Sequence, residues 1–185
     1  MRYLIVIFIL ALGVLGLAQS SAEILNETVT YTISKDGSVQ KKVSQRIQLN
    51  DAVAFGTFGE WFYTYNPSLE SVEILKSETV QPDGTVVPTP ENGMMDQGPS
   101  AVANAPDFSY LRERMVSHTG LEPGCVVEFV WVVSDLKPFR TVIFESMSAN
   151  FPIQTKRVSF VGSLPGKVLA HGNIEKSGKN SKIFS

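Results

Sequence analysis

Residues 38–49 read SVQKKVSQRIQL, and polar and apolar side chains alternate along this stretch. The odd-numbered positions from 39 to 49 carry Val, Lys, Val, Gln, Ile and Leu, whereas the even-numbered positions from 38 to 48 are all polar. Successive side chains of a β-strand point to opposite faces, so this alternation indicates a strand with one face in water. The stretch therefore predicts a β-strand that packs its other face on a hydrophobic core.

The residues before this stretch predict the strand that pairs with it. The apolar and aromatic residues of this earlier run share one phase: Leu25, Val29, Tyr31 and Ile33. They are residue types that favour strands. Asp36-Gly37 lies between the two runs, and Asp-Gly between alternating segments favours a tight hairpin turn. We therefore expect the chain to begin its fold with a β-hairpin.

Alternation, or short apolar runs bounded by Gly, Pro and Asp, predicts further strands along the chain. They cover residues 72–80, 85–87, 110–117, 125–133, 141–144, 153–161 and 168–170. The run 110–117 also fits a short helix, but Arg112 and Arg114 share a phase that favours a strand with exposed arginines. In residues 125–133 only Glu128 is polar, so both faces are apolar and we expect a central strand covered on both sides.

These elements predict an all-β fold, an Ig-like antiparallel β-sandwich of roughly seven or eight strands over residues 23–170. Two connections, residues 51–68 and 88–107, are unusually long. Loops of that length inside a compact domain are usually functional or mobile. Residues 171–185 are rich in Gly, Asn, Ser and Lys, and we interpret them as a frayed tail or as a truncated end of the sandwich.

The N-terminus has the pattern of a secretory signal peptide. Residues 1–3 form a short basic start, residues 4–18 contain no polar side chain, and Ala18-Gln19-Ser20 and Ser20-Ser21-Ala22 place small residues two apart. We predict a signal-peptide helix over residues 1–22 and an exported protein, periplasmic or extracellular. The alternatives are a buried helix and a membrane anchor, for which the apolar run is short against the roughly 20 residues that span a bilayer. We expect membrane contact only through an uncleaved signal sequence.

The composition excludes several classes of partner and site. The 185-residue chain is 43% hydrophobic and 18% charged, which is enough apolar material for a folded core. Its formal charge of -2 leaves no basic excess, so nucleic acid is not expected as a partner. One cysteine excludes internal disulfides and Cys-rich zinc sites, and two histidines leave little for metal chemistry. We predict no metal site and no cofactor.

No catalytic residue is predicted. Cys125 with His118 or His171 would be a thiol nucleophile and its base, but Cys125 lies in a strand-like run without the features that lower a thiol pKa. We interpret Cys125 as a core residue and the histidines as surface or turn residues. Two acid pairs would act as paired carboxylates only if the fold joined them: Glu113 with Glu128, and Asp96 with Asp107. We interpret these acids as structural or solvated.

The stretch from Phe55 to Tyr65 holds six of the 18 aromatic residues of the chain. Three interpretations remain open: the segment plugs the core at one end of the sandwich, it contacts another domain, or it stacks on a ligand such as a sugar. If the segment binds anything, its candidate binding residues are Phe58, Trp61, Phe62, Tyr63 and Tyr65.

The order of turn and strand signatures resembles a known family. The signatures are Asp36-Gly37, Gln45-Arg46-Ile47, Tyr65-Asn66-Pro67, Ser71-Val72-Glu73-Ile74, Pro82-Asp83-Gly84-Thr85, Pro106-Asp107-Phe108, Arg112, Leu121 to Glu128, and Phe151-Pro152-Ile153. Over about residues 24–170 the chain resembles the uncharacterised β-sandwich domain found N-terminal to transglutaminase-like domains in exported bacterial proteins. The resemblance implies an Ig-like sandwich whose chemistry, where present, belongs to a downstream papain-fold domain.

The sequence thus favours a non-enzymatic, exported accessory domain that binds a protein partner or a transglutaminase-like domain through a sheet edge or the aromatic segment. One alternative is a carbohydrate-binding module that uses the aromatic segment, residues 55–65. The other is a part of a transglutaminase- or protease-like hydrolase whose catalytic domain is absent from this sequence.

Overall fold

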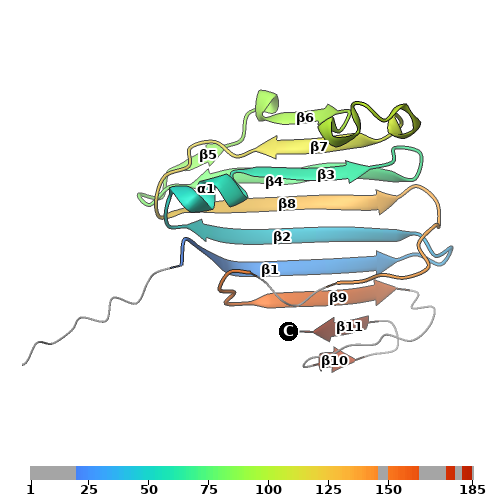
Figure 1. Cartoon of the computed structure of the whole chain (residues 1–185). Helices are drawn as coiled ribbons and strands as arrows, with labels where there is room; N and C mark the ends of the chain where they lie inside the picture. Colours follow the sequence, from blue (N-terminus) through green and yellow to red (C-terminus); the bar gives the residue numbers. More distant parts are fainter. Residues whose placement is uncertain (1–19, 146–149, 163–173, 178–180, 185) are drawn as a thin grey trace, which may run out of the picture.

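The computed structural model describes residues 20–145, 150–162, 174–177 and 181–184 (Figure 1). The first 19 residues of the predicted signal peptide and the predicted strand 168–170 lie outside these residues. No helix in the described part is both long enough and apolar enough to cross a membrane.

The described strands form two sheets, which confirms the predicted all-β sandwich (Figure 1). The strands are β1 (Ala22–Ile33), β2 (Val39–Leu49), β3 (Glu60–Tyr65), β4 (Glu70–Val80), β5 (Val86–Pro88), β6 (Met94–Gln97), β7 (Arg112–Ser117), β8 (Cys125–Asp135), β9 (Lys156–Gly162), β10 (Ile174–Ser177) and β11 (Ser181–Phe184). The large sheet has the order β10-β11-β9-β1-β2-β8-β4-β5, and the small sheet has the order β3-β7-β6. Strands β10 and β11 fall in the stretch that the sequence suggested was a frayed tail or the end of the sandwich.

The hairpin of β1 and β2 is confirmed at the predicted turn, but a bulge between Ile24 and Asn26 shifts the phase of β1, so Ile24 and not Leu25 is buried with Val29, Tyr31 and Ile33. Ile33 pairs with Val39 at the turn, and Ala22 pairs with Leu49 at the far end. Gly37 has a φ of 90°, a conformation that residues with a side chain rarely adopt. The Asp36 carboxylate accepts hydrogen bonds from the backbone and hydroxyl of Ser38, which closes the turn.

Strand β8 lies inside the large sheet, between β2 and β4, as predicted, but it is not covered on both faces. Its inner face is buried: Cys125, Val127, Phe129, Trp131 and Val133. On the outer face only Val132 is buried, and the other residues are partly exposed. Val132 pairs with Lys42 of β2 and Glu73 of β4, whose long side chains can shield it without a second layer of structure. The expectation of two-sided coverage was therefore wrong.

The two long connections contain regular structure that the sequence did not predict. Residues 51–68 include the helix α1 (Ala52–Phe58), capped by the Asp51 carboxylate, and then strand β3. Residues 88–107 include strand β6 and the short 3-10 turns Glu91–Gly93, Ser100–Val102 and Pro106–Phe108.

The predicted strand 141–144 does not form. It lies in the crossover, which we define as residues 136–155 between β8 and β9. Strand β1 already has β2 and β9 as neighbours, and β8 already has β2 and β4, so no sheet position beside either is vacant. Parts of the crossover pack instead on the core of the sandwich, through Ile143, Phe151 and Ile153.

Candidate functional site

The residues proposed from sequence as a thiol nucleophile and base are not arranged for catalysis. Cys125 is fully buried in β8, and burial raises the pKa of its thiol, so its interpretation as a core residue is confirmed. His118 is not a surface residue, because it is 8% exposed and its ring packs edge-on against Phe129. His171 lies outside the described residues.

His118 belongs to a buried polar cluster between the sheets. Its Nδ1 lies 3.0 Å from the Ser77 hydroxyl, which lies 2.6 Å from the Thr89 hydroxyl. Burial lowers the pKa of His118 to about 4, so the imidazole is neutral at pH 7. Ser77 and Thr89 are also buried, and this arrangement supports a structural role for the histidine.

The acid pair Glu113–Glu128 is not brought together by the fold. Glu113 lies on β7 of the small sheet, whereas Glu128 lies on β8 of the large sheet, where Arg46 and Lys76 pair with it. In the other predicted pair, Asp96 with Asp107, the Asp96 carboxylate is bound by Arg112, at 2.8 Å, and by the Tyr65 hydroxyl, at 2.5 Å. In the described part of the chain, His, Cys, Asp and Glu side chains form no group of three suited to a metal ion.

The aromatic segment is divided between two faces. The ring of Trp61 lies 5.1 Å from those of both Phe129 and Trp131, in the core. Phe62, the next residue of β3, is 49% exposed. Tyr63 packs against the core like Trp61, because alternate residues of a strand share a face.

The other two aromatic candidates are also engaged within the protein. The Phe58 ring contacts Phe151 of the crossover at 5.0 Å, and the Tyr65 hydroxyl binds Asp96. These five side chains therefore do not form one flat stacking surface, and most of them serve the packing of the sandwich.

Charged side chains occur on the inner face of the large sheet, beside the crossover. Lys156 of β9 lies 2.5 Å from Glu27 of β1 and 3.7 Å from Glu145 of the crossover, and Lys41 of β2 lies 2.8 Å from Glu145. The side chains of Glu27 and Lys156 are each only 10% exposed. Buried charges require partners of this kind, so the ion pairs tie the crossover to β2 and β9 and join β9 to β1.

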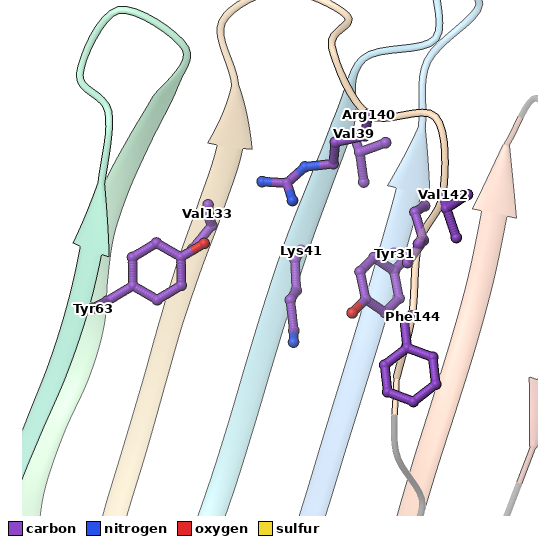
Figure 2. Close-up of a pocket in the computed structure, with 9 residues that line it drawn as sticks. Tyr31, Val39, Lys41, Tyr63, Val133, Arg140, Val142 and Phe144 are labelled. Atoms are coloured by element: carbon purple, nitrogen blue, oxygen red, sulfur yellow. The ribbon is translucent and has the colours of Figure 1, made fainter. Parts of the chain in front are cut away.

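A cavity of about 150 Å³ lies next to these ion pairs (Figure 2). It is lined by Tyr31, Val39, Lys41, Tyr63, Val133, Arg140, Val142, Ile143 and Phe144. Figure 2 shows the Arg140 guanidinium and the Lys41 side chain between the rings of Tyr63 and Tyr31. The cavity thus combines two cationic groups and two phenols with aliphatic walls.

Hydrogen bonds fix the polar side chains around the cavity. The Tyr31 hydroxyl donates to Glu145 at 2.7 Å, and the Tyr63 hydroxyl donates to Glu70 at 3.3 Å. Arg140 pairs with Asp135 at 2.8 Å and with Glu70. This network holds Arg140 and Tyr63 in place although they come from different layers.

The same contacts determine the ionisation of the network. Burial and the neighbouring carboxylate of Glu145 raise the pKa of Tyr31, and burial and Glu70 raise the pKa of Tyr63, so both phenols stay protonated. Burial opposes ionisation of Glu145, but hydrogen bonds from Lys41 and Tyr31 outweigh it and lower the pKa of that carboxyl. The two phenols that line the cavity are therefore neutral, and the Glu145 carboxylate lies just outside it, bound to Lys41 and Tyr31.

Beside the cavity, the crossover presents an apolar strip, which we define as Leu136, Phe139, Val142 and Phe144. Val142 is 78% exposed and Phe144 is 84% exposed. Large apolar side chains exposed to this degree on one short segment make it a candidate interaction surface. Sequence reasoning missed this site, although one signal pointed to it: Lys41 interrupts the apolar phase of β2 at a core-facing position.

The large sheet also has an unpaired edge in the described part of the chain. Strand β5 pairs only with Glu78–Val80 of β4, so the first part of β4 has β8 on one side and no strand on the other. A bulge between Ile74 and Lys76 interrupts this stretch. Bulges protect edges against pairing with another chain, so this edge is a weaker docking candidate than the apolar strip.

Comparison with known proteins places the chain among sandwich domains of unknown activity. Residues 35–168 match the family DUF3857, described as a domain of unknown function with solved structures. A crystal structure of a "putative protease" from Parabacteroides distasonis is 29% identical, with a TM-score of 0.73. The match covers 90% of this chain and 35% of that one, so this chain spans about a third of the similar protein. None of the curated proteins is significantly similar.

Proposed function

Because the chain belongs to the DUF3857 family, whose function is unknown, we propose from its geometry that it is a non-enzymatic accessory domain that holds or orients another polypeptide. The observation that carries the proposal is the apolar strip, in which Val142 and Phe144 expose most of their surface to water. Burying such side chains against a partner is favourable by about 25 cal/mol per Å². The strip is also tied firmly to the sandwich, by the ion pairs of Arg140 and Glu145.

The partner we propose is a catalytic domain, transglutaminase-like, in the same polypeptide or in another exported one. The resemblance of the turn and strand signatures supports this choice. The similarity to about a third of a chain described as a "putative protease" is consistent with a sandwich that accompanies a larger enzyme. The N-terminal sequence supports export to the periplasm or the cell exterior.

Site-specific photo-crosslinking in the native host tests the proposal. A photoreactive phenylalanine analogue replaces Phe144, and a matched variant carries it at Phe62, which is also exposed but lies on the small sheet. We expect position 144 to crosslink to residues of a transglutaminase-like domain, identified by mass spectrometry, and position 62 to give no such product. Equal labelling from both positions, or crosslinks from position 144 only to polysaccharide or lipid, contradicts the proposal.

A further inference from the structure

We propose that the cavity between Tyr31 and Tyr63 binds an extended, uncharged peptide segment, with a small aliphatic side chain inside the cavity. A backbone carbonyl of that segment accepts hydrogen bonds from Lys41 and Arg140. The inference deepens the proposed function, on which it rests for the partner being a polypeptide, by naming the chemistry that the site recognises.

The size of the cavity suits a small aliphatic group. Its volume is about 150 Å³, which is comparable to the engineered protein cavity that binds benzene. A valine or isoleucine side chain with part of its peptide group has a similar number of heavy atoms. The aliphatic walls formed by Val39, Val133 and Ile143 provide apolar contacts for such a group.

The two cationic residues retain hydrogen-bond donors for a ligand. A guanidinium has five N–H groups and an ammonium has three. Arg140 donates to Asp135 and Glu70 and also hydrogen-bonds to Tyr63, which uses three of its N–H groups, and Lys41 uses one toward Glu145. Both side chains line the cavity, so a ligand carbonyl placed there meets two donors.

The balance of charge indicates that this ligand is neutral. The network contains three cations, Lys41, Arg140 and Lys156, and four carboxylates, Glu27, Glu70, Asp135 and Glu145. The two cations that line the cavity already have carboxylate partners behind them, Glu145 for Lys41 and Asp135 and Glu70 for Arg140. A ligand carboxylate would therefore add negative charge to cations that are already neutralised, and a ligand ammonium would lie directly against them. A peptide carbonyl accepts hydrogen bonds without either penalty.

The crossover beside the cavity favours an extended ligand. Val142 and Phe144 are exposed, whereas Ile143 between them packs on the core, which is the alternation of a strand. This stretch pairs with no strand in the described part of the chain. An extended peptide can therefore lie along it, add backbone hydrogen bonds and place alternate side chains toward the cavity.

Methyl-detected NMR on the purified chain tests the inference with blocked tripeptides. The probe is acetyl-Gly-Val-Gly-amide, and the matched probes carry Asp or Lys in place of Val. We expect the Val peptide to shift the methyl resonances of Val39, Val133 and Val142, with a Kd on the order of 1 mM, and not those of the distant Val86. The Asp and Lys peptides should bind at least about tenfold more weakly.

Paired variants locate the effect in the cavity. Lys41→Met should weaken binding of the Val peptide about fivefold by removing a donor, whereas Lys42→Met, on the opposite face of β2, should leave binding unchanged. Phe144→Ser should weaken binding without cost to the fold, because Phe144 is highly exposed, and Phe62→Ser is its control. Equal binding of the Asp peptide, or unchanged binding in both Lys41→Met and Phe144→Ser, overturns the inference.

The outcomes distinguish this inference from the proposed function. Peptide binding to the isolated chain without a crosslink from position 144 would contradict the docking of a catalytic domain and leave the peptide site standing. A crosslink without shifts of the cavity methyl groups, up to about 20 mM peptide, would overturn the peptide site and leave docking standing.

Discussion

At the scale of single residues, His118 shows how the interior tolerates an ionisable group. It is buried against Phe129, and its Nδ1 lies within hydrogen-bond distance of the Ser77 hydroxyl. Because burial lowers the pKa of the imidazole to about 4, the folded protein keeps His118 neutral over a range in which an unfolded chain would protonate it.

We predict that this histidine makes folding depend on pH between about 6.5 and 4. The unfolded chain binds a proton below its ordinary pKa, whereas the folded chain does so only near pH 4, so the free energy of unfolding falls as the pH falls through this window. The loss should be about 2 kcal/mol between pH 7 and pH 4.5. Urea unfolding of the wild type and of His118→Gln at pH 7 and pH 4.5 measures it, and equal pH dependence of the two proteins contradicts the assignment.

At the scale of elements, strand β3 presents neighbouring aromatic residues to different environments. Trp61 packs on the rings of Phe129 and Trp131, while Phe62 faces away from the core and is half exposed. The aromatic content of this strand therefore reflects two separate uses, a bridge between the sheets and an outward-facing surface.

We predict opposite consequences for truncating these two neighbours. Trp61→Ala should lower the free energy of unfolding by about 3 to 5 kcal/mol, because it leaves a cavity between the sheets. Phe62→Ala should change the same quantity by less than about 0.5 kcal/mol. Chemical unfolding followed by circular dichroism measures both, and a similar loss in the two variants would show that the alternation along β3 is not as described.

Periodicity explains which elements were predictable. Strand β2 alternates over 11 residues, and such a long pattern fixes both the strand and its buried face. Strands β1 and β4 change phase at a bulge, and β8 is apolar on both faces, so their sequences indicate a strand but not its buried face throughout. Helix α1 has only seven residues, too few for a helical stripe to appear. The stretch 141–144 is a short run of strand-forming residues, but the sheet positions beside β1 and β8 are occupied, which no local pattern reveals.

The candidate site was harder to predict because its residues come from distant parts of the chain. Lys41, Tyr63 and Arg140 lie on β2, β3 and the crossover, and only the packing of the two layers brings them to one cavity. The sequence did single out Tyr63, but as part of an aromatic cluster rather than as a wall of a polar cavity. Conversely, the histidine lacked any local signal of burial, since His118 directly follows the end of β7.

At the scale of the whole molecule, residues 20–22 contact the end of β2, so the sandwich needs these residues to complete its first strand pair. Ala22 is fully buried and pairs with Leu49, and the carbonyl oxygens of Ser20 and Ser21 accept hydrogen bonds from the side chain and the backbone of Asn50. The two small-residue patterns of the predicted signal peptide end at Ser20 and at Ala22, and chains that start after these residues would keep different parts of this contact.

We predict that a chain starting at Ser21 is more stable than one starting at Glu23. The shorter chain lacks the buried side chain of Ala22 and the hydrogen bond from Asn50 to Ser21, and should lose about 1 to 2 kcal/mol in the free energy of unfolding. Thermal unfolding of the two purified chains tests this. Identical midpoints would show that strand β1 does not depend on its first residue.

The parallel pairing of β1 with β9 sets the order in which the protein can be completed. Glu27, near the start of the domain, is the register partner of Lys156, so the large sheet joins residues synthesised early to residues synthesised late. Until residues 156–162 are available, one edge of β1 stays open and the Glu27 carboxylate lacks the ammonium that pairs with it. The large sheet therefore cannot close around β1 until a segment more than 100 residues further along the chain has joined it.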